Sequence, residues 1–322
     1  MVKALVLHGG AGAWSLSTQE RREKAKRVVE ECTKRGWKKL EEENNAVEAV
    51  VESIKCMEDS GILNAGWGSV PDLFGERGLD AGIMASNGLL GAVGDVRATR
   101  NAIELARIVA EETPHILIVG RGADELARVK GLAPLPPPPQ RVVELYHKYL
   151  EKVVEGKYTR PYIDALRVFL EKNPDYRRIL KKAVVISDTV GACALDDTGL
   201  LVAGVSTGGL LLKLPGRVGD SSIPGAGFYA TDRIACSATG IGERIIKTMP
   251  CMMLDQVYRE KGILEETANT VLKYATRLVG EDSLGFIAID YKGGIVWKYN
   301  TEAILVGYVR EGEISVELSG LD

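Results

Sequence analysis

Hydroxyl-bearing side chains in four glycine-rich segments are the strongest candidates for chemistry in this chain. The segments are DTVGACAL at 188–195, STGG at 206–209, LPGRVGDSSIPGAGFYA at 214–230 and SATGIGE at 237–243. A single threonine in an apolar run is usually structural, because its β-branched side chain suits a pleated sheet. Four such segments in succession are harder to explain by packing, and they favour a threonine that acts as a nucleophile.

Other catalytic patterns fit the chain poorly. The glycines of HGGAG at 8–12 follow a strand-like run, but no G-x-x-x-x-G-K-[ST] occurs, and GRGADE at 120–125 lacks the last glycine of G-x-G-x-x-G. No G-x-S-x-G motif accompanies the three histidines, which disfavours a serine–histidine–aspartate triad. We expect His8, at the end of a strand, to form structural hydrogen bonds rather than act as a base.

Composition and charge narrow the class of protein. The 322 residues are 45% hydrophobic and 26% charged, which is ordinary for a globular chain, and the formal net charge of -3 gives no basic excess for nucleic acid. No apolar stretch approaches the ~20 residues that a membrane-spanning helix needs, and the apolar run at the amino terminus is too short for a signal peptide. We therefore expect a cytoplasmic protein that binds neither nucleic acid nor membrane.

The cysteines and glutamines carry weaker signals. The five cysteines are widely spaced and form no CxxC pair, so we expect reduced, mostly buried thiols with no disulfide and no metal site. Only three glutamines occur among many Lys, Arg and Glu residues, a bias that suggests heat adaptation. The cysteines in question are Cys32, Cys56, Cys193, Cys236 and Cys251.

Hydrophobic periodicity predicts strands and helices mixed along the whole chain. The stretch APLPPPPQ at 133–140 is expected to be a stiff connector, followed by a basic helical arm at 141–182. Two apolar runs around DDTG at 196–199 predict a hairpin. The other expected strands are 3–8, with the glycines after it in a tight loop, 79–86, 89–94, 116–119, 283–290, 294–300 and 303–309; the other expected helices are 19–36, 44–59, 101–112, 252–260 and 264–279.

Six motifs along the chain carry a resemblance to a known family: HGGAG at 8–12, LNAGWGSV at 63–70, LDAGIM at 79–84, DTVGACALD at 188–196, STGG at 206–209 and PGRVGDSSIPGAGFYA at 215–230. Together they resemble the plant-type asparaginases, also called isoaspartyl aminopeptidases. These enzymes are N-terminal nucleophile hydrolases, and the likeness covers nearly the whole chain outside about 133–182. It implies an α+β fold, a four-layer αββα sandwich in one domain, 1–322. It also implies self-cleavage into an α chain, 1–188, with a mobile linker at about 133–187, and a β chain, 189–322, paired as a dimer of αβ heterodimers.

The resemblance also implies how the threonine becomes active. The Thr189 hydroxyl attacks the preceding carbonyl, and hydrolysis of the resulting ester frees the Thr189 α-amine. That amine has an unperturbed pKa near ~7.7–8 and can serve as the base at neutral pH. Asp188 stands where most plant-type members have glycine, and it either assists this cleavage, which we favour, or only shapes the turn. Ser187 stands where many relatives have histidine.

Further roles carry over to matching positions. Thr207 is expected to hydrogen-bond the nucleophile, while the Thr239 hydroxyl and the Gly240 backbone N–H form the oxyanion hole. Arg217 is expected to hold the substrate α-carboxylate and Asp220 its α-ammonium.

Two more positions of the resemblance concern the approach of the chain to its ligand. Gly242 allows close approach of the backbone, whereas Ile241 replaces a polar residue that is common in the family.

Asn64 lies in a segment that matches a sodium-binding loop of relatives; the alternative is a simple turn residue. Catalysis is expected to need no cofactor, and a structural sodium ion would be held by backbone carbonyls alone. The carbonyls in question belong to Met57, Glu58, Ser60, Leu63, Ala65 and Trp67.

The resulting hypothesis is hydrolysis of the β-amide of L-asparagine, of β-aspartyl dipeptides, or of both, to give L-aspartate. Two alternatives stay open. One is a glycosylasparaginase- or taspase-like hydrolase that uses the same threonine. The other is an inactive scaffold that binds partners through its proline-rich connector.

Overall fold

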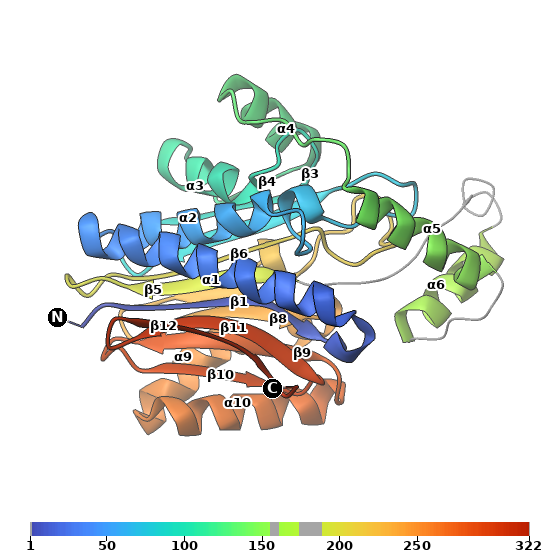
Figure 1. The fold of residues 1–322 in the computed structure, drawn as a ribbon. Coiled ribbons are helices and arrows are strands. Elements are labelled where there is room, and N and C mark those ends of the chain that lie inside the picture. The colour runs from blue at the N-terminus through green and yellow to red at the C-terminus, as the bar shows by residue number, and fades with distance from the viewer. Residues whose placement is uncertain (1, 155–160, 174–188, 322) are drawn as a thin grey trace.

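The computed structural model describes residues 2–154, 161–173 and 189–321, and two β-sheets form its centre (Figure 1). The strands are β1 (Ala4–Gly12), β2 (Leu79–Ala85), β3 (Leu90–Val96), β4 (Leu117–Val119), β5 (Val190–Leu195), β6 (Leu201–Thr207), β7 (Phe228–Ala230), β8 (Ile234–Gly240), β9 (Leu284–Asp290), β10 (Ile295–Tyr299), β11 (Ala303–Arg310) and β12 (Glu313–Ser319). One sheet has the order β12-β11-β1-β5-β6-β2-β3-β4, and the other has the order β10-β9-β8-β7.

Helices cover the outer faces of both sheets. These helices are α1 (Gln19–Glu42), α2 (Ala46–Asp59), α3 (Ala102–Glu112), α4 (Gly120–Val129), α8 (Gly242–Thr248), α9 (Pro250–Lys261) and α10 (Leu264–Val279). Helices α5 (Gln140–Val154) and α6 (Pro161–Lys172) lie to the side of the sheets (Figure 1). The short 3₁₀ turns are η1 (Trp14–Leu16), η2 (Gly66–Gly68) and η3 (Asp220–Ser222). In Figure 1, α1, α2 and α3 lie on one side of the paired sheets, and α9 and α10 lie on the other. The predicted four-layer αββα sandwich is confirmed.

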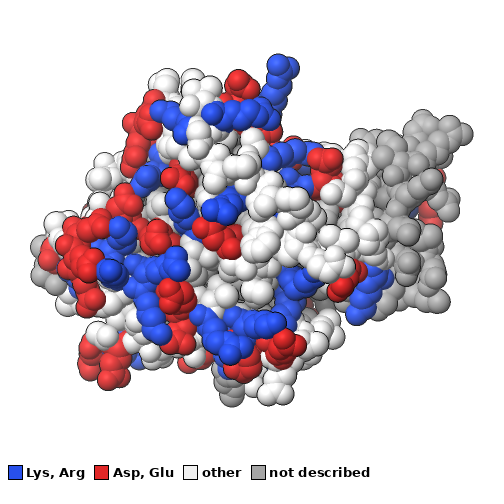
Figure 2. All heavy atoms as spheres, turned by 45° about the horizontal axis from the view of Figure 1, so that its top comes forward, with Lys and Arg blue, Asp and Glu red and all other residues white. Residues whose placement is uncertain are grey.

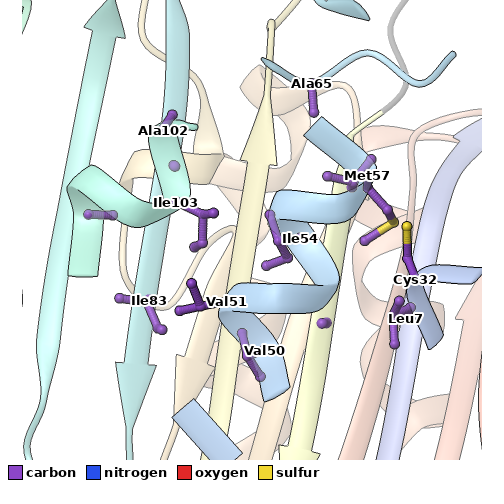
Figure 3. Close-up of a cluster of buried hydrophobic side chains, with 14 of the residues drawn as sticks. Leu7, Cys32, Val50, Val51, Ile54, Met57, Ala65, Ile83, Ala102 and Ile103 are labelled. Carbon is purple, nitrogen blue, oxygen red and sulfur yellow. The ribbon is translucent and has the colours of Figure 1, made fainter. Parts of the chain in front are cut away.

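The apolar stripe of α2 shows why this helix forms and where it packs. Its start is capped by the Asn45 side chain, which accepts the Glu48 N–H at 3.0 Å. Val50, Ile54 and Met57 recur at helical spacing and are fully buried. Figure 3 shows these three side chains in one cluster with residues of the strands, such as Leu7 and Ile83.

The predicted hairpin places Thr189 at the centre of the larger sheet. β5 and β6 pair antiparallel on either side of the 196–199 turn, where Asp196 Oδ1 accepts the N–H groups of Thr198 and Leu200. β5 also pairs antiparallel with β1. Since Val190 begins β5, Thr189 lies at the end of a strand held on both sides.

The secondary structure differs from the sequence prediction at several points. β1 does not end in a tight glycine loop: it continues to Gly12, with a register shift against β11 between His8 and Ala11. Strands β7, β8 and β12 and helices α4 and α8 were not expected. β8 reads IACSATG, and its small residues give little strand signal although it lies second from the edge of the smaller sheet.

The predicted connector and arm fall partly outside the described residues. Pro134 bridges to Thr99, the Pro137 carbonyl accepts Trp67 Nε1–H at 3.0 Å, and the Pro136 carbonyl accepts Arg77 Nη2–H. The proline-rich segment is therefore bonded to the body of the fold at several points. Helices α5 and α6 follow it, while 155–160 and 174–188 are not described.

The expectation that no disulfide forms is wrong. Cys32 of α1 and Cys56 of α2 form a disulfide with a Cα–Cα distance of 5.5 Å, because the two helices pack against each other; Figure 3 shows Cys32 beside Met57. Their separation of 24 residues contains no sequence signal for this contact. Cys193, Cys236 and Cys251 are free and buried, as expected.

Replacing both disulfide cysteines with serine should destabilise the protein. A crosslink that closes a loop of this length stabilises the folded state by about 3 kcal/mol, chiefly by restricting the unfolded chain, which for a chain of this size is about 5 °C in Tm. The comparison is Cys32→Ser/Cys56→Ser against wild type in calorimetry without reductant. Under reductant the two should melt together, and equal Tm values without reductant would contradict the crosslink.

Charged side chains of both signs are interspersed on the face shown in Figure 2, without a large area of one sign. Along α1, ion pairs at spacing i, i+4 join Glu20 to Lys24 at 2.7 Å and Glu31 to Arg35 at 2.9 Å. Such exposed pairs contribute little singly, and networks of them matter more at high temperature.

Candidate active site

Thr189 is buried, with 2% of its surface exposed, and its hydroxyl donates to Thr207 Oγ1 at 3.2 Å. Thr207 ends β6, the strand that pairs with β5, so sheet register alone brings the two threonines together. Thr207 Oγ1 also accepts the Gly209 N–H at 2.9 Å. The Thr189 hydroxyl is therefore held in one orientation by a partner that is itself fixed.

His8 holds the backbone of Thr189 rather than its hydroxyl. Its Nδ1 lies 3.1 Å from the Thr189 carbonyl oxygen, and its Nε2 lies 3.1 Å from Ser237 Oγ. Because a carbonyl can only accept, Nδ1 carries the proton. Complete burial lowers the pKa of His8 to about 3, against a smaller upward effect of the bond to Thr189, so the ring stays neutral. The expected structural role of His8 is confirmed.

Thr239 and Gly240 end β8 on the facing sheet. Thr239 Oγ1 accepts the Ala11 N–H at 3.3 Å, which leaves the proton of this hydroxyl free to be donated. Gly240 has φ +138°, and an added Cβ would lie 2.4 Å from the Ser283 carbonyl oxygen. Only glycine fits there without displacement of the backbone.

A narrow pocket joins these groups to the 214–230 segment. It brings together six of the seven residues to which the sequence assigned catalysis or substrate binding; Thr239, the seventh, does not line it. Gly209 and Leu210, which were not predicted, complete the wall. The full lining is Thr189, Thr207, Gly209, Leu210, Arg217, Asp220, Gly240 and Gly242.

Arg217 is clamped by Glu243, a residue that sequence reasoning missed. Its Nε and Nη2 donate to Glu243 Oε1 and Oε2, each at 2.9 Å. Burial raises the pKa of Glu243, but the hydrogen bonds and charge of Arg217 outweigh it and lower that pKa overall. Glu243 ends the SATGIGE segment, so the signal was present. Among the described residues no partner bonds Arg217 Nη1, which leaves that edge of the guanidinium for a ligand.

Asp220 is a buried carboxylate whose Oδ2 has no hydrogen-bond partner among the described residues. Burial raises its pKa to about 7, although the positive charge of Arg217 opposes the shift. An added Cβ at Gly242 would lie 2.6 Å from Arg217 Nη2 and 2.8 Å from Asp220 Oδ1. Glycine at this position therefore lets the chain pass directly against both charged groups.

Asn64 ties the 63–70 segment to the pocket. Its Nδ2 donates to the Gly209 carbonyl at 2.9 Å, its Oδ1 accepts the Val70 N–H at 2.9 Å, and its own carbonyl accepts the Gly208 N–H at 2.9 Å. These three bonds fix the loop that follows Thr207.

Three of the six carbonyls expected around a sodium ion already accept hydrogen bonds. Ser60 Oγ donates to Met57 O at 2.7 Å, Gly68 N to Ala65 O at 3.0 Å, and Arg77 Nη1 to Trp67 O at 2.9 Å. Met57 O also accepts the Ser60 N–H at 3.3 Å, so both of its lone pairs are used. The Ala65 and Trp67 oxygens each retain a second lone pair, so the loop still fits an oxygen-coordinated cation through its other carbonyls. In the described part of the chain no cluster of His, Cys, Asp and Glu could hold a metal.

Comparison with known proteins supports the resemblance along the whole chain. A family model described as Asparaginase matches residues 1–318. The chain belongs to the asparaginase family.

The asparaginase-family relatives include archaeal and bacterial proteins. A "Plant-type L-asparaginase" from Pyrobaculum calidifontis is 39% identical over 98% of this chain and 99% of its own, and one from Pyrococcus horikoshii is 36% identical over 96% and 97%. An "Isoaspartyl peptidase" from Salmonella typhimurium is 33% identical over 94% of each chain. The archaeal relatives agree with the heat adaptation suggested by composition.

Two of the residues discussed from the sequence are not described by the structure. Asp188 and Ser187 lie outside the described residues. No helix within the described ranges combines the length and apolarity needed to cross a membrane.

Proposed function

We propose that the chain is a self-cleaving threonine hydrolase of β-aspartyl amides, acting on L-asparagine and β-aspartyl dipeptides. The supporting observation is that the Thr189 hydroxyl, the free edge of Arg217 and the Asp220 carboxylate open onto one pocket. A carboxylate and an ammonium on one carbon require such a pair of opposite charges. The relatives' names include both asparaginase and isoaspartyl peptidase, which supports both substrates.

The proposed reaction has two halves. The free α-amine of Thr189 takes the proton from its own hydroxyl, whose oxygen attacks the side-chain carbonyl of the substrate. The Gly240 N–H and the Thr239 hydroxyl stabilise the oxyanion. The leaving ammonia or amine takes up the proton that the Thr189 amine had accepted, and a β-aspartyl ester remains on Thr189. Water then loses a proton to the same amine and attacks the ester, and that proton passes to the Thr189 oxygen as L-aspartate is released.

The pH dependence should differ between asparagine and succinamate, which lacks the α-amine. Asp220 has a raised pKa of about 7 and must be ionised to pair with an ammonium, so protonation below pH 7 weakens asparagine binding. The Thr189 amine must also be neutral, so log kcat/KM should fall with a slope of about two for asparagine but about one for succinamate below pH 6.5. Asp220→Asn should abolish the difference, and equal slopes in the wild type would contradict it.

We also propose that activity requires cleavage between Asp188 and Thr189, with Asp188 assisting. In Asp188→Ala, the full-length band of 34.8 kDa should persist longer on a denaturing gel during warming. The cleaved fraction should turn over at nearly the wild-type rate, because Asp188 is then the end of the α chain. If the cleaved variant turns over much more slowly than the wild type, Asp188 takes part in turnover.

Ammonia release from L-asparagine tests the proposed function directly. No release from asparagine or β-aspartyl dipeptides by the cleaved protein would refute it. Release of sugar amine from a glycosylated asparagine, or cleavage of a protein substrate alone, would favour the glycosylasparaginase- or taspase-like alternative. No hydrolysis of any of these would favour the scaffold.

The 57–68 loop is proposed to hold a structural sodium ion. Glu58 is fully buried and accepts hydrogen bonds from Ser206, Asn101 and Ile103, but no cationic side chain pairs with it among the described residues. Burial raises the pKa of Glu58 to about 8, although these hydrogen bonds oppose the shift. A cation bound by the neighbouring carbonyls would favour the charged form of this carboxyl. A higher Tm in sodium chloride than in choline chloride of equal ionic strength is expected; equal values would oppose the site.

We also propose that two αβ units pair as a dimer and that the protein acts in the cytoplasm. β4 is an edge strand of the larger sheet, and Leu117 and Val119 on it, with the preceding Ile116, are about half exposed. Apolar edges of this kind are usually covered. Light scattering should give the mass of two αβ units, and Leu117→Lys should lower it to one.

A further inference from the structure

We propose that Lys213 is a positioning residue that supplies a second positive charge to the α-carboxylate subsite, behind Gly209 and beside Arg217. The inference deepens the proposed function and depends on it. Lys213 does not line the pocket, so it acts through its charge on the subsite rather than through contact with the substrate.

Lys213 is fully buried, which is rare for a lysine. Its Nζ donates to the Gly78 carbonyl at 2.7 Å, and no ion pair within 4.0 Å joins it to an acid among the described residues. Burying an ammonium without a contacting counter-ion is costly, so a purely structural role would favour an apolar residue here. Burial lowers the pKa of Lys213, an effect that the nearby Asp80, Asp95 and Asp72 oppose and that Arg217 reinforces.

The ammonium of Lys213 and the free edge of Arg217 converge on one point of the pocket wall. An added Cβ at Gly209 would lie 2.9 Å from Lys213 Nζ and 3.0 Å from Arg217 Nη1, so these two nitrogens are within about 6 Å of each other. Gly209, with φ +73°, lines the pocket. Two like charges are brought together where an anion is expected to bind.

The balance of charge explains why one arginine is insufficient. Glu243 neutralises Arg217 through two hydrogen bonds, and Asp220 adds a negative charge to the same pocket. Asp80 lies behind the pocket wall, where its Oδ2 accepts the Gly219 N–H at 2.9 Å and holds the loop between Arg217 and Asp220. Its carboxylate is a further negative charge close to the subsite. Lys213 offsets this structural acid. Without it, the substrate carboxylate would approach a subsite with excess negative charge.

Two variants separate the charge of Lys213 from its hydrogen bond. Lys213→Met keeps the length and removes both, whereas Lys213→Gln keeps a donor for the Gly78 carbonyl and removes only the charge. The substrates are asparagine, succinamate, which keeps the α-carboxylate, and β-alaninamide, which lacks it. For each cleaved variant, kcat and KM are measured from ammonia release, together with Tm and the extent of self-cleavage.

Both variants should raise KM for asparagine and succinamate about tenfold, with kcat changed less than threefold, since a charge at ~6 Å in a partly buried site acts mainly on binding of the anion. For β-alaninamide kcat/KM should stay within twofold of wild type. Loss of the Lys213 charge should also move the acid limb of the asparagine pH profile to higher pH, because removal of a nearby positive charge raises the pKa of Asp220. The other charged groups that face Asp220 are Arg217, Asp80 and Glu243.

Three results would overturn the inference: wild-type KM for asparagine in Lys213→Gln, an equal loss with all three substrates, or an unchanged acid limb. If Lys213→Met does not fold or cleave, Lys213→Gln alone decides. Failure of the proposed function is distinguishable, because it would appear as absence of asparagine hydrolysis in the wild type.

Discussion

Thr189→Ala should remain a single chain of 34.8 kDa and should lose amidase activity. The Thr189 hydroxyl, at 3.2 Å from Thr207 Oγ1, is the nucleophile proposed for both self-cleavage and turnover. Nucleophile removal in other hydrolases lowers kcat by about 10⁶-fold, so the residual rate should be near background. A denaturing gel before and after warming and an ammonia assay measure the two effects.

Two matched variants distinguish lost chemistry from lost folding. Thr189→Val preserves the shape of the side chain and should behave like alanine while keeping the wild-type Tm of the precursor. Thr189→Ser keeps a hydroxyl and should still cleave, with slower turnover because serine lacks the methyl group that restricts its rotamer. An exposed threonine on α10, Thr270, serves as control, since Thr270→Ala should change nothing. Two bands from Thr189→Ala would refute the assignment.

Sequence patterns predicted the parts of the fold that short-range rules specify. The helical stripe of α2 and the β5–β6 hairpin around 196–199 follow from spacing and turn residues within the segment itself. β8 was not predicted because Ala235, Ser237 and Gly240 have weak strand preference, and because its partner strand β9 is distant in the sequence, with Gly240 paired to Leu284 and Ile234 to Asp290. The Cys32–Cys56 disulfide escaped for the same reason: it depends on how two helices pack.

The same division applies to the candidate site. Motifs identified Thr189, Arg217 and Asp220, because the resemblance assigns roles to positions. They did not reveal the clamp of Glu243 on Arg217 or the raised pKa of Asp220, since both depend on burial and on the approach of α8 to the 214–230 segment. Charge compensation is a property of the assembled pocket and not of any one segment.

Arg217→Lys should lower kcat/KM for asparagine and β-aspartyl dipeptides by about 30- to 3000-fold, the effect of breaking a buried charged contact worth ~2–5 kcal/mol. Lysine supplies a point charge without the planar fork, so it cannot bind Glu243 with two nitrogens and still offer a third to the substrate. Asp220→Ala should produce a similar loss, because the α-ammonium then has no counter-charge. Self-cleavage, which involves no substrate head group, should continue in both.

Arg233→Lys is the matched control for Arg217→Lys. Arg233 also makes two hydrogen bonds to one buried carboxylate, with Nε 3.1 Å from Asp255 Oδ1 and Nη2 3.2 Å from Oδ2, but it does not line the pocket. Its replacement should lower Tm and leave KM unchanged, so a KM effect confined to Arg217→Lys reports substrate binding rather than a general loss of stability. Succinamate and β-alaninamide extend the test. Asp220→Ala should not weaken succinamate, Arg217→Lys should not weaken β-alaninamide, and wild-type kcat/KM for asparagine in either variant would remove that residue from the site.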